Sequence, residues 1–108
     1  MSREKTTNEI REEFLSHIRH LIGYWSKIPQ DNVKERLEGL AFSILVALDG
    51  GSSLPRFIVA PIQYEEDKEY HIENGEDYYP ENHEIEEQIK GDISGCLHEL
   101  LRKKGIWM

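Results

Sequence analysis

The stretch Leu40-Ala41-Phe42-Ser43-Ile44-Leu45-Val46-Ala47-Leu48 is apolar at every position except Ser43. Further apolar residues precede it at a three-to-four spacing, and they begin after Asn32, a residue type that caps helix starts. The stretch ends at Asp49-Gly50-Gly51, where glycine favours the end of a helix. The sequence therefore predicts a helix over 32–49 whose second half is enclosed on nearly all sides and forms the centre of the core, so that a charge at Ile44 or Leu45 should unfold the domain.

A second helical pattern lies before this stretch. Its apolar positions fall on one stripe: Ile10, Phe14, Ile18, Leu21, Ile22 and Trp25. Thr7 or Asn8 is the expected N-cap, and Pro29 ends the pattern because proline cannot continue a helix. These residues predict a helix over 8–27.

A third helical pattern covers 83–104. Its inward positions would be Ile85, Ile89, Ile93, Cys96, Leu97, Leu100 and Leu101, with the single cysteine as a small buried hydrophobe. Arg102, Lys103 and Lys104 would face the negative end of the helix dipole, with Gly105 as the cap.

Two glycines stand inside that third pattern. Gly91 and Gly95 would each cost ~1 kcal/mol relative to alanine in a helix. We therefore expect another backbone to approach closely there, either the second helix near Gly39 or a second subunit.

The segments between the helices are shorter and polar. Phe57, Ile58 and Val59, bracketed by prolines, predict a short strand near 56–60 or a lone extended segment. Residues 64–81 are expected to form an irregular acidic segment or a small hairpin around the turn Asn74-Gly75. The fold class is thus mainly α (α+β), with three amphipathic helices in a single domain over 1–108, of which 1–6 are expected to be disordered.

Negative charge is concentrated in the middle of the chain. Residues 64–87 contain eleven acidic side chains and one base, Lys68, whereas the whole chain has a net charge of −8. Because a nucleic-acid backbone is bound by basic surfaces, this charge argues against direct binding of duplex nucleic acid. The one cysteine, the polar N-terminus and the short apolar runs predict a cytoplasmic protein without a membrane partner.

No complete catalytic or cofactor-binding motif is present in the sequence. Gly50-Gly51-Ser52-Ser53 follows a helix C-terminus, so it is interpreted as a cap and not as a phosphate loop. His17 and His20, three residues apart, could share one helix face, but such pairs are mostly solvated or half-buried. His71 and His83 lie among carboxylates, but their spacing matches no calcium loop. We expect no metal and no cofactor.

Four tyrosines, Tyr64, Tyr70, Tyr78 and Tyr79, are interleaved with the acids. Their rings either pack onto the helices or line a recess for a planar or phosphorylated ligand. On the second interpretation the rings would stack on a base, and Lys68 and His71 would meet phosphates. The candidate ligand-binding residues are Asp67, Lys68, Tyr70, His71, Asn74, Tyr78 and Tyr79.

Four stretches, within roughly 36–101, carry a resemblance to a known family: EGLAFSILVALDG (38–50), DKEYH (67–71), NGEDYYP (74–80) and DISGCLHEL (92–100). They resemble a family of small, mostly uncharacterised phage and bacterial proteins that are often loosely described as ATP-binding. The resemblance implies a phage-type accessory protein.

Three functions follow as hypotheses. The first is a non-enzymatic homo-oligomer that binds a nucleotide-like ligand or signal, for example in counter-defence. The alternative is an acidic protein-interaction module that docks on a basic, nucleic-acid-binding host protein. An enzyme with Asp67, His71 and Asp92 as acid–base groups comes third; because no spacing supports it, we expect no enzymatic activity.

Overall fold

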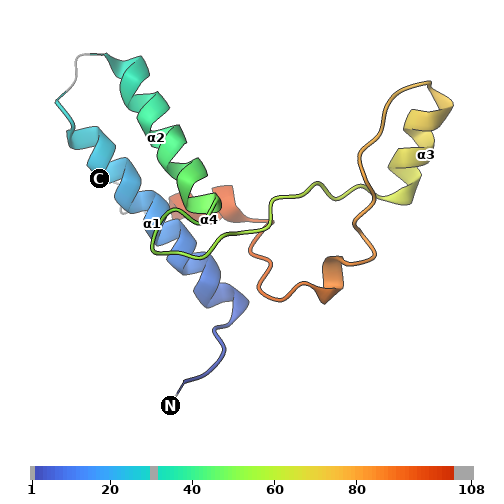
Figure 1. The fold of residues 1–108 in the computed structure, drawn as a ribbon, viewed down its shortest axis with the longest axis horizontal. Coiled ribbons are helices and arrows are strands. Elements are labelled where there is room, and N and C mark those ends of the chain that lie inside the picture. The colour runs from blue at the N-terminus through green and yellow to red at the C-terminus, as the bar shows by residue number, and fades with distance from the viewer. Residues whose placement is uncertain (1, 30–31, 104–108) are drawn as a thin grey trace. The chain divides into compact units, whose positions relative to one another are not determined.

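The computed structural model describes residues 2–29 and 32–103. The helices are α1 (Thr7–Lys27), α2 (Val33–Leu48), α3 (Glu65–Glu73) and α4 (Leu97–Lys103), with a short 3-10 turn, η1 (Glu86–Gln88) (Figure 1). The only β-pairing within the described ranges is an isolated bridge between Gln63 and Glu81. The mainly α fold class is therefore confirmed.

The chain divides into two compact units. Unit 1 consists of the described parts of Met1–Phe57 and Gly91–Met108, and unit 2 is Ile58–Lys90. Unit 1 holds α1, α2 and α4, and unit 2 holds α3 and η1. None of the helices within the described ranges has the length and apolar character needed to cross a membrane.

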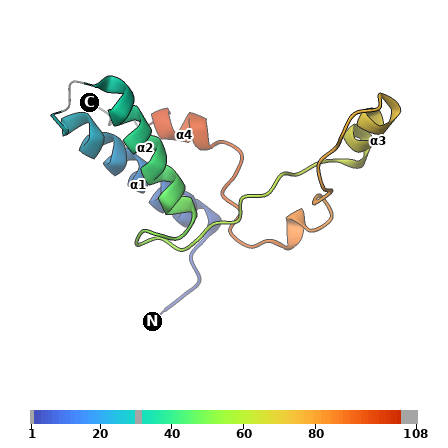
Figure 2. The ribbon, with the colours of Figure 1, turned by 45° about the horizontal axis from the view of Figure 1, so that its top comes forward.

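Helices α1 and α2 form an antiparallel pair (Figures 1 and 2). The N-cap of α1 is Thr6, and not Thr7 or Asn8 as predicted, because Thr6 and Glu9 form a reciprocal capping box. Asn32 caps α2 as predicted, since its side chain accepts hydrogen bonds from the backbone of Lys34 and Glu35. These caps satisfy backbone N–H groups that a helix start leaves without partners.

The core of unit 1 is centred on α1. Phe14, Leu15 and Ile18 of α1 are buried together with Ile93, and the Phe57 ring packs edge-on against Phe14 at 5.1 Å. α1 contacts both α2 and α4, so it has neighbours on two sides. The core therefore gains its largest apolar burial from α1.

The prediction that α2 forms the enclosed centre of the core is wrong. Phe42 and Leu45 are 68% and 58% exposed, although Ala47 is buried and Ile44 packs against the core. Among the described helices of unit 1, α1 is the only one that contacts α2, so one face of α2 is covered by a helix within this unit. On that face the Trp25 indole N–H donates to Ser43 Oγ, 3.1 Å away. A Cβ built at Gly39 would lie 2.5 Å from the Trp25 ring, so glycine is needed there.

The predicted helix over 83–104 is also wrong for most of its length. Gly91 and Gly95 have φ angles of +74° and +118°, values that break a right-handed helix, and α4 begins only at Leu97. The glycines thus provide left-handed backbone instead of the expected close helix packing. Cys96, predicted to be buried, is exposed. The predicted cap at Lys104 and Gly105 lies outside the described residues.

No strand is formed near 56–60, where the chain is extended without a partner strand among the described residues. Phe57 N donates to Leu48 O at 3.0 Å, which anchors this segment to the end of α2. The predicted glycine cap of α2 is confirmed, since Gly50 has a φ of +87°.

Candidate functional site

The acidic segment, residues 64–81, contains a helix, where the sequence predicted an irregular segment or a small hairpin. α3 begins with Glu65, Glu66 and Asp67, whose charges favour the positive end of a helix dipole. Asn74 is the C-cap, and Gly75 follows with a φ of +68°. The Asn74-Gly75 pair thus ends a helix instead of joining two strands.

Lys68 links α3 to the segment that returns from it. Its ammonium lies 3.0 Å from Glu81 Oε1 and 5.1 Å from the centre of the Tyr78 ring. The hydrogen bond and the opposite charge of Glu81 raise the pKa of Lys68. Lys68 and Tyr78 are therefore brought together as the sequence suggested, but a carboxylate already accompanies the ammonium.

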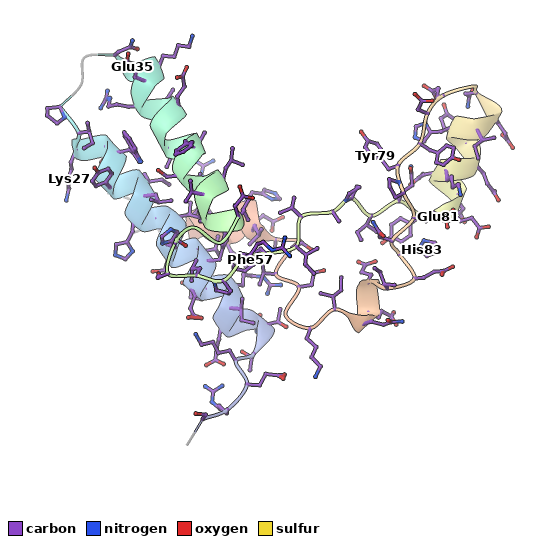
Figure 3. All side chains as sticks on the ribbon, viewed as in Figure 1. Lys27, Glu35, Phe57, Tyr79, Glu81 and His83 are labelled. Carbon is purple, nitrogen blue, oxygen red and sulfur yellow. The ribbon has the colours of Figure 1, made fainter. Side chains whose placement is uncertain are left out.

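The base of this segment is closed by the buried side chain of Gln63, 7% exposed, which accepts a hydrogen bond from the backbone N–H of Tyr79. Gln63 also pairs with Glu81 in the isolated bridge, and the backbone carbonyl oxygen of Gln63 lies 3.3 Å from His83 Nδ1. Tyr79, Glu81 and His83 follow one another along the returning segment (Figure 3). Unit 2 is thus held by polar contacts more than by an apolar core.

The other predicted site residues lie along α3 and at its C-cap. Asp67, Tyr70 and Asn74 are three and four residues apart and share one face, where Asn74 Nδ2 donates to Tyr70 O at 2.7 Å. His71 lies beside both Asp67 and Lys68, four and three residues away, and His71 Nδ1 lies 3.4 Å from Glu76 Oε1. Among the seven predicted residues, the structure thus shows three contacts: Lys68 with Tyr78, Tyr70 with His71, and Asn74 with Tyr70.

The tyrosines of unit 2 are largely exposed. Tyr64, Tyr70, Tyr78 and Tyr79 each have at least half of their surface exposed, and the Tyr78 ring contacts Lys68 of α3. Partial contacts remain: the Tyr64 ring lies 5.9 Å from the His83 ring, and the Tyr70 ring lies 5.8 Å from the His71 ring. The result is an exposed aromatic and acidic surface.

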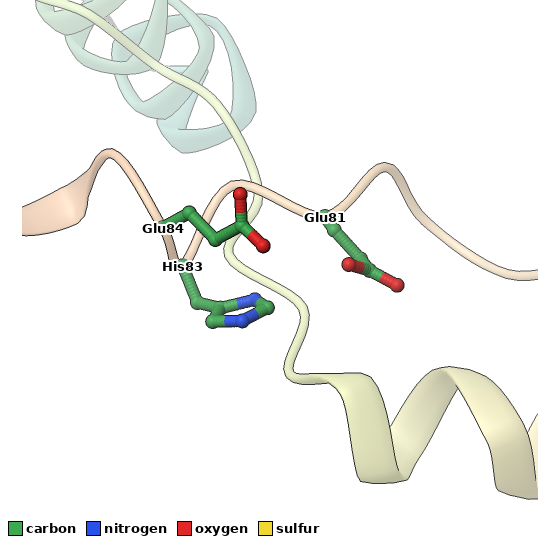
Figure 4. A group of neighbouring side chains, drawn as sticks. All are labelled: Glu81, His83 and Glu84. Atoms are coloured by element: carbon green, nitrogen blue, oxygen red, sulfur yellow. The ribbon is translucent and has the colours of Figure 1, made fainter.

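One group of side chains has the composition of a cation site. Glu81, His83 and Glu84 each offer a ligand atom, and these atoms lie within 4.8 Å of one another (Figure 4). Oxygen and imidazole ligands suit a divalent ion. Glu81 also pairs with Lys68, so an ion would compete with that ammonium.

The histidines singled out in the sequence do not gather at this group, apart from His83. His71 faces Glu76, and His17 and His20 line an open groove of about 850 Å³ along α1 in unit 1. His20 Nδ1 lies 3.0 Å from Ser16 O within its own helix.

Sequence reasoning missed Gln63 and Glu81. Glu81 contacts the predicted residue Lys68, and Gln63 contacts the predicted residue Tyr79; in both pairs the residues are at least thirteen positions apart in the sequence. No periodic pattern marks such contacts, because each depends on how the chain returns along α3.

Comparison with protein-family models, curated proteins and solved structures gives no match for this chain.

Proposed function

We propose that unit 2 is a protein-interaction surface that binds a basic protein partner. The observation that supports the proposal most directly is that the acidic side chains of α3 are exposed and its lysine is paired. Its acids Glu65, Glu66, Asp67, Glu69 and Glu73 are all exposed, while its one lysine is paired with Glu81. The surface thus offers a partner a dense negative charge with little positive charge of its own.

The exposed tyrosines complement this charge. Tyr70 lies on α3 among the acids, and Tyr79 lies on the returning segment. Arginine guanidinium groups bind carboxylates in pairs and also stack on aromatic rings. A partner rich in arginine would therefore use both features, and the resemblance to phage and bacterial proteins favours a host protein that normally binds nucleic acid.

A direct test measures binding of an arginine-rich peptide and of a lysine-rich peptide of equal length by fluorescence anisotropy. We expect tighter binding of the arginine peptide and a steep loss of affinity with added salt. Glu69→Lys with Glu73→Lys should weaken binding at least tenfold. The matched control, Glu35→Lys with Glu99→Lys, changes the net charge equally but in unit 1, and should keep most of the affinity. Equal losses in the two double variants would contradict the proposal.

A nucleotide-like ligand is the second candidate. The observation that favours it is the placement of the Lys68 ammonium 5.1 Å from the centre of the exposed Tyr78 ring, since a base can stack on the ring while the ammonium meets phosphate. The neighbouring carboxylates oppose phosphate binding. A thermal-shift panel of nucleotides and cyclic dinucleotides, with and without Mg²⁺, tests this candidate. Stabilisation that Lys68→Met abolishes would support it, and no shift at millimolar nucleotide would exclude it.

A further inference from the structure

The outward face of α2 carries large apolar side chains that the rest of the described part of unit 1 leaves open. Leu37, Phe42 and Leu45 are 61%, 68% and 58% exposed, whereas Ile44 and Leu48 pack against the core. A group of exposed apolar side chains on one helix marks a surface that a partner covers.

The residues along this face have the spacing of a seam between two helices. Lys34, Glu38, Ala41 and Leu45 follow one another at intervals of four, three and four residues, which places them on one stripe of α2. Ala41 is exposed in the middle of the stripe, and its small side chain allows a second helix to approach closely. Phe42 lies beside it as the largest apolar group.

The two ends of the stripe carry opposite charges. Lys34 lies in the first turn of α2, and Asp49 is its C-cap; both are exposed. An acid at that end faces the negative pole of the helix dipole, and the last turn of α2 has no basic residue to offset it. A lysine supplied from outside α2 would compensate both the acid and the dipole.

We infer that α2 pairs antiparallel with α2 of a second copy of this chain. With the two-fold axis between Ala41 and Phe42, Ala41 of one copy lies opposite Phe42 of the other. The same register places Lys34 of one copy opposite Asp49 of the other, and the symmetry repeats each contact. In this register α2 matches itself in size at the centre of the stripe and in charge at its ends, and the two helix dipoles run in opposite directions.

The size of this face sets the expected strength. α2 has 16 residues, so it is ~24 Å long and about 10 Å wide, and two such faces bury roughly 500–1,000 Å² in total. That area belongs to weak, reversible complexes, so we expect a dissociation constant in the micromolar range. The inference concerns unit 1 and is independent of the function proposed for unit 2.

Sedimentation equilibrium of the full chain from about 1 to 500 μM tests the pairing. We expect a monomer–dimer equilibrium that Phe42→Ser weakens at least tenfold. Ile72→Ser, which removes an apolar side chain of α3 that is 52% exposed, should leave the equilibrium unchanged.

Charge reversal tests the register. Lys34→Glu and Asp49→Lys should each weaken the dimer several-fold, and the double variant should regain most of the affinity because it restores opposite charges across the axis. A chain that stays monomeric throughout the concentration range overturns the inference, even if slow amide exchange shows α2 covered by another part of the same chain. A dimer that Phe42→Ser leaves intact, or in which the double variant shows no recovery, overturns it equally.

Discussion

Replacing Arg19 with alanine should strongly destabilise the fold of unit 1. The Arg19 side chain is only 9% exposed, and it joins α1 to the last turn of α4. Its Nη2 donates to Leu100 O at 3.0 Å and its Nε to Leu101 O at 3.4 Å, while Nη1 pairs with Glu12 at 3.1 Å. These carbonyl groups belong to a helix end, which has no donors of its own for them.

The expected cost follows from these contacts. A hydrogen bond from a charged donor contributes ~1.5–3 kcal/mol, and the bond to Leu101 is long, so Arg19→Ala should lower the free energy of unfolding by about 2–4 kcal/mol. For a domain of this size that corresponds to a fall in Tm of roughly 10–25 °C. Thermal and urea unfolding followed by circular dichroism measures both quantities.

Two comparison variants separate burial from charge. Arg19→Lys keeps the charge but cannot reach both carbonyls, so it should fall between the native chain and Arg19→Ala. Arg3→Ala removes a shorter ion pair, 2.6 Å from Glu9, but one that is exposed, so Tm should hardly change. If Arg3→Ala and Arg19→Ala shift Tm equally, or if Arg19→Ala costs less than about 0.5 kcal/mol, the argument from burial is refuted.

Three further predictions concern unit 1. Gly91→Ala forces a side chain into a backbone with φ of +74° and should cost ~1–2 kcal/mol in urea unfolding, and an unchanged midpoint would show that this backbone relaxes freely. Hydrogen bonds from Arg3 lower the pKa of Glu9 from 4.5 to about 2, so any stability that ionised Glu9 contributes is complete above pH 4.5 and is lost as the pH falls to about 2. In Arg3→Ala, NMR titration should show the pKa of Glu9 return towards 4.5. An unchanged pKa of Glu9 would show that Arg3 does not cause the shift. Ile44→Asp should unfold the chain, because Ile44 packs against the core. Leu45→Asp should keep the circular dichroism spectrum of the native fold, because Leu45 is exposed. Equal loss of structure in both variants would show that the face of α2 that carries Leu45 is also enclosed.

Periodic apolar spacing predicted α1 and α2 to within about two residues, because both helices bury a stripe against each other. It failed for 83–104, where Ile85, Ile89 and Ile93 stand at helical spacing but only Ile93 is buried in the core. The left-handed glycines Gly91 and Gly95 decide the backbone there. Apolar spacing carries no information on the sign of φ, so two glycines outweighed a regular pattern.

The opposite error occurred at α3, which has no buried residue and therefore no apolar stripe to detect. The charges do indicate the start of this helix, because the three successive acids at 65–67 stabilise a first helical turn. Asn74-Gly75 is equally suited to a hairpin turn and to a helix end, so the pair alone could not distinguish them. A short helix without a buried face is thus predicted from its capping residues and charges, and not from apolar periodicity.

For the predicted ligand-binding residues, the structure adds a partner that the sequence did not indicate. Lys68 lies over the Tyr78 ring, and the carboxylate of Glu81 beside the ammonium changes what this pair of side chains offers to a ligand. A lysine already paired with a carboxylate binds phosphate less strongly, because phosphate must displace or tolerate that charge.

This pairing also connects stability with binding in unit 2. The acids of α3 repel one another, and the unit has few apolar contacts to offset that repulsion, so its folded state is held by contacts such as those of Lys68 and Gln63. A basic partner would relieve the repulsion at the same surface that it recognises. Binding energy and the folding energy of unit 2 are then linked, and an arginine-rich partner should stabilise α3 as it binds.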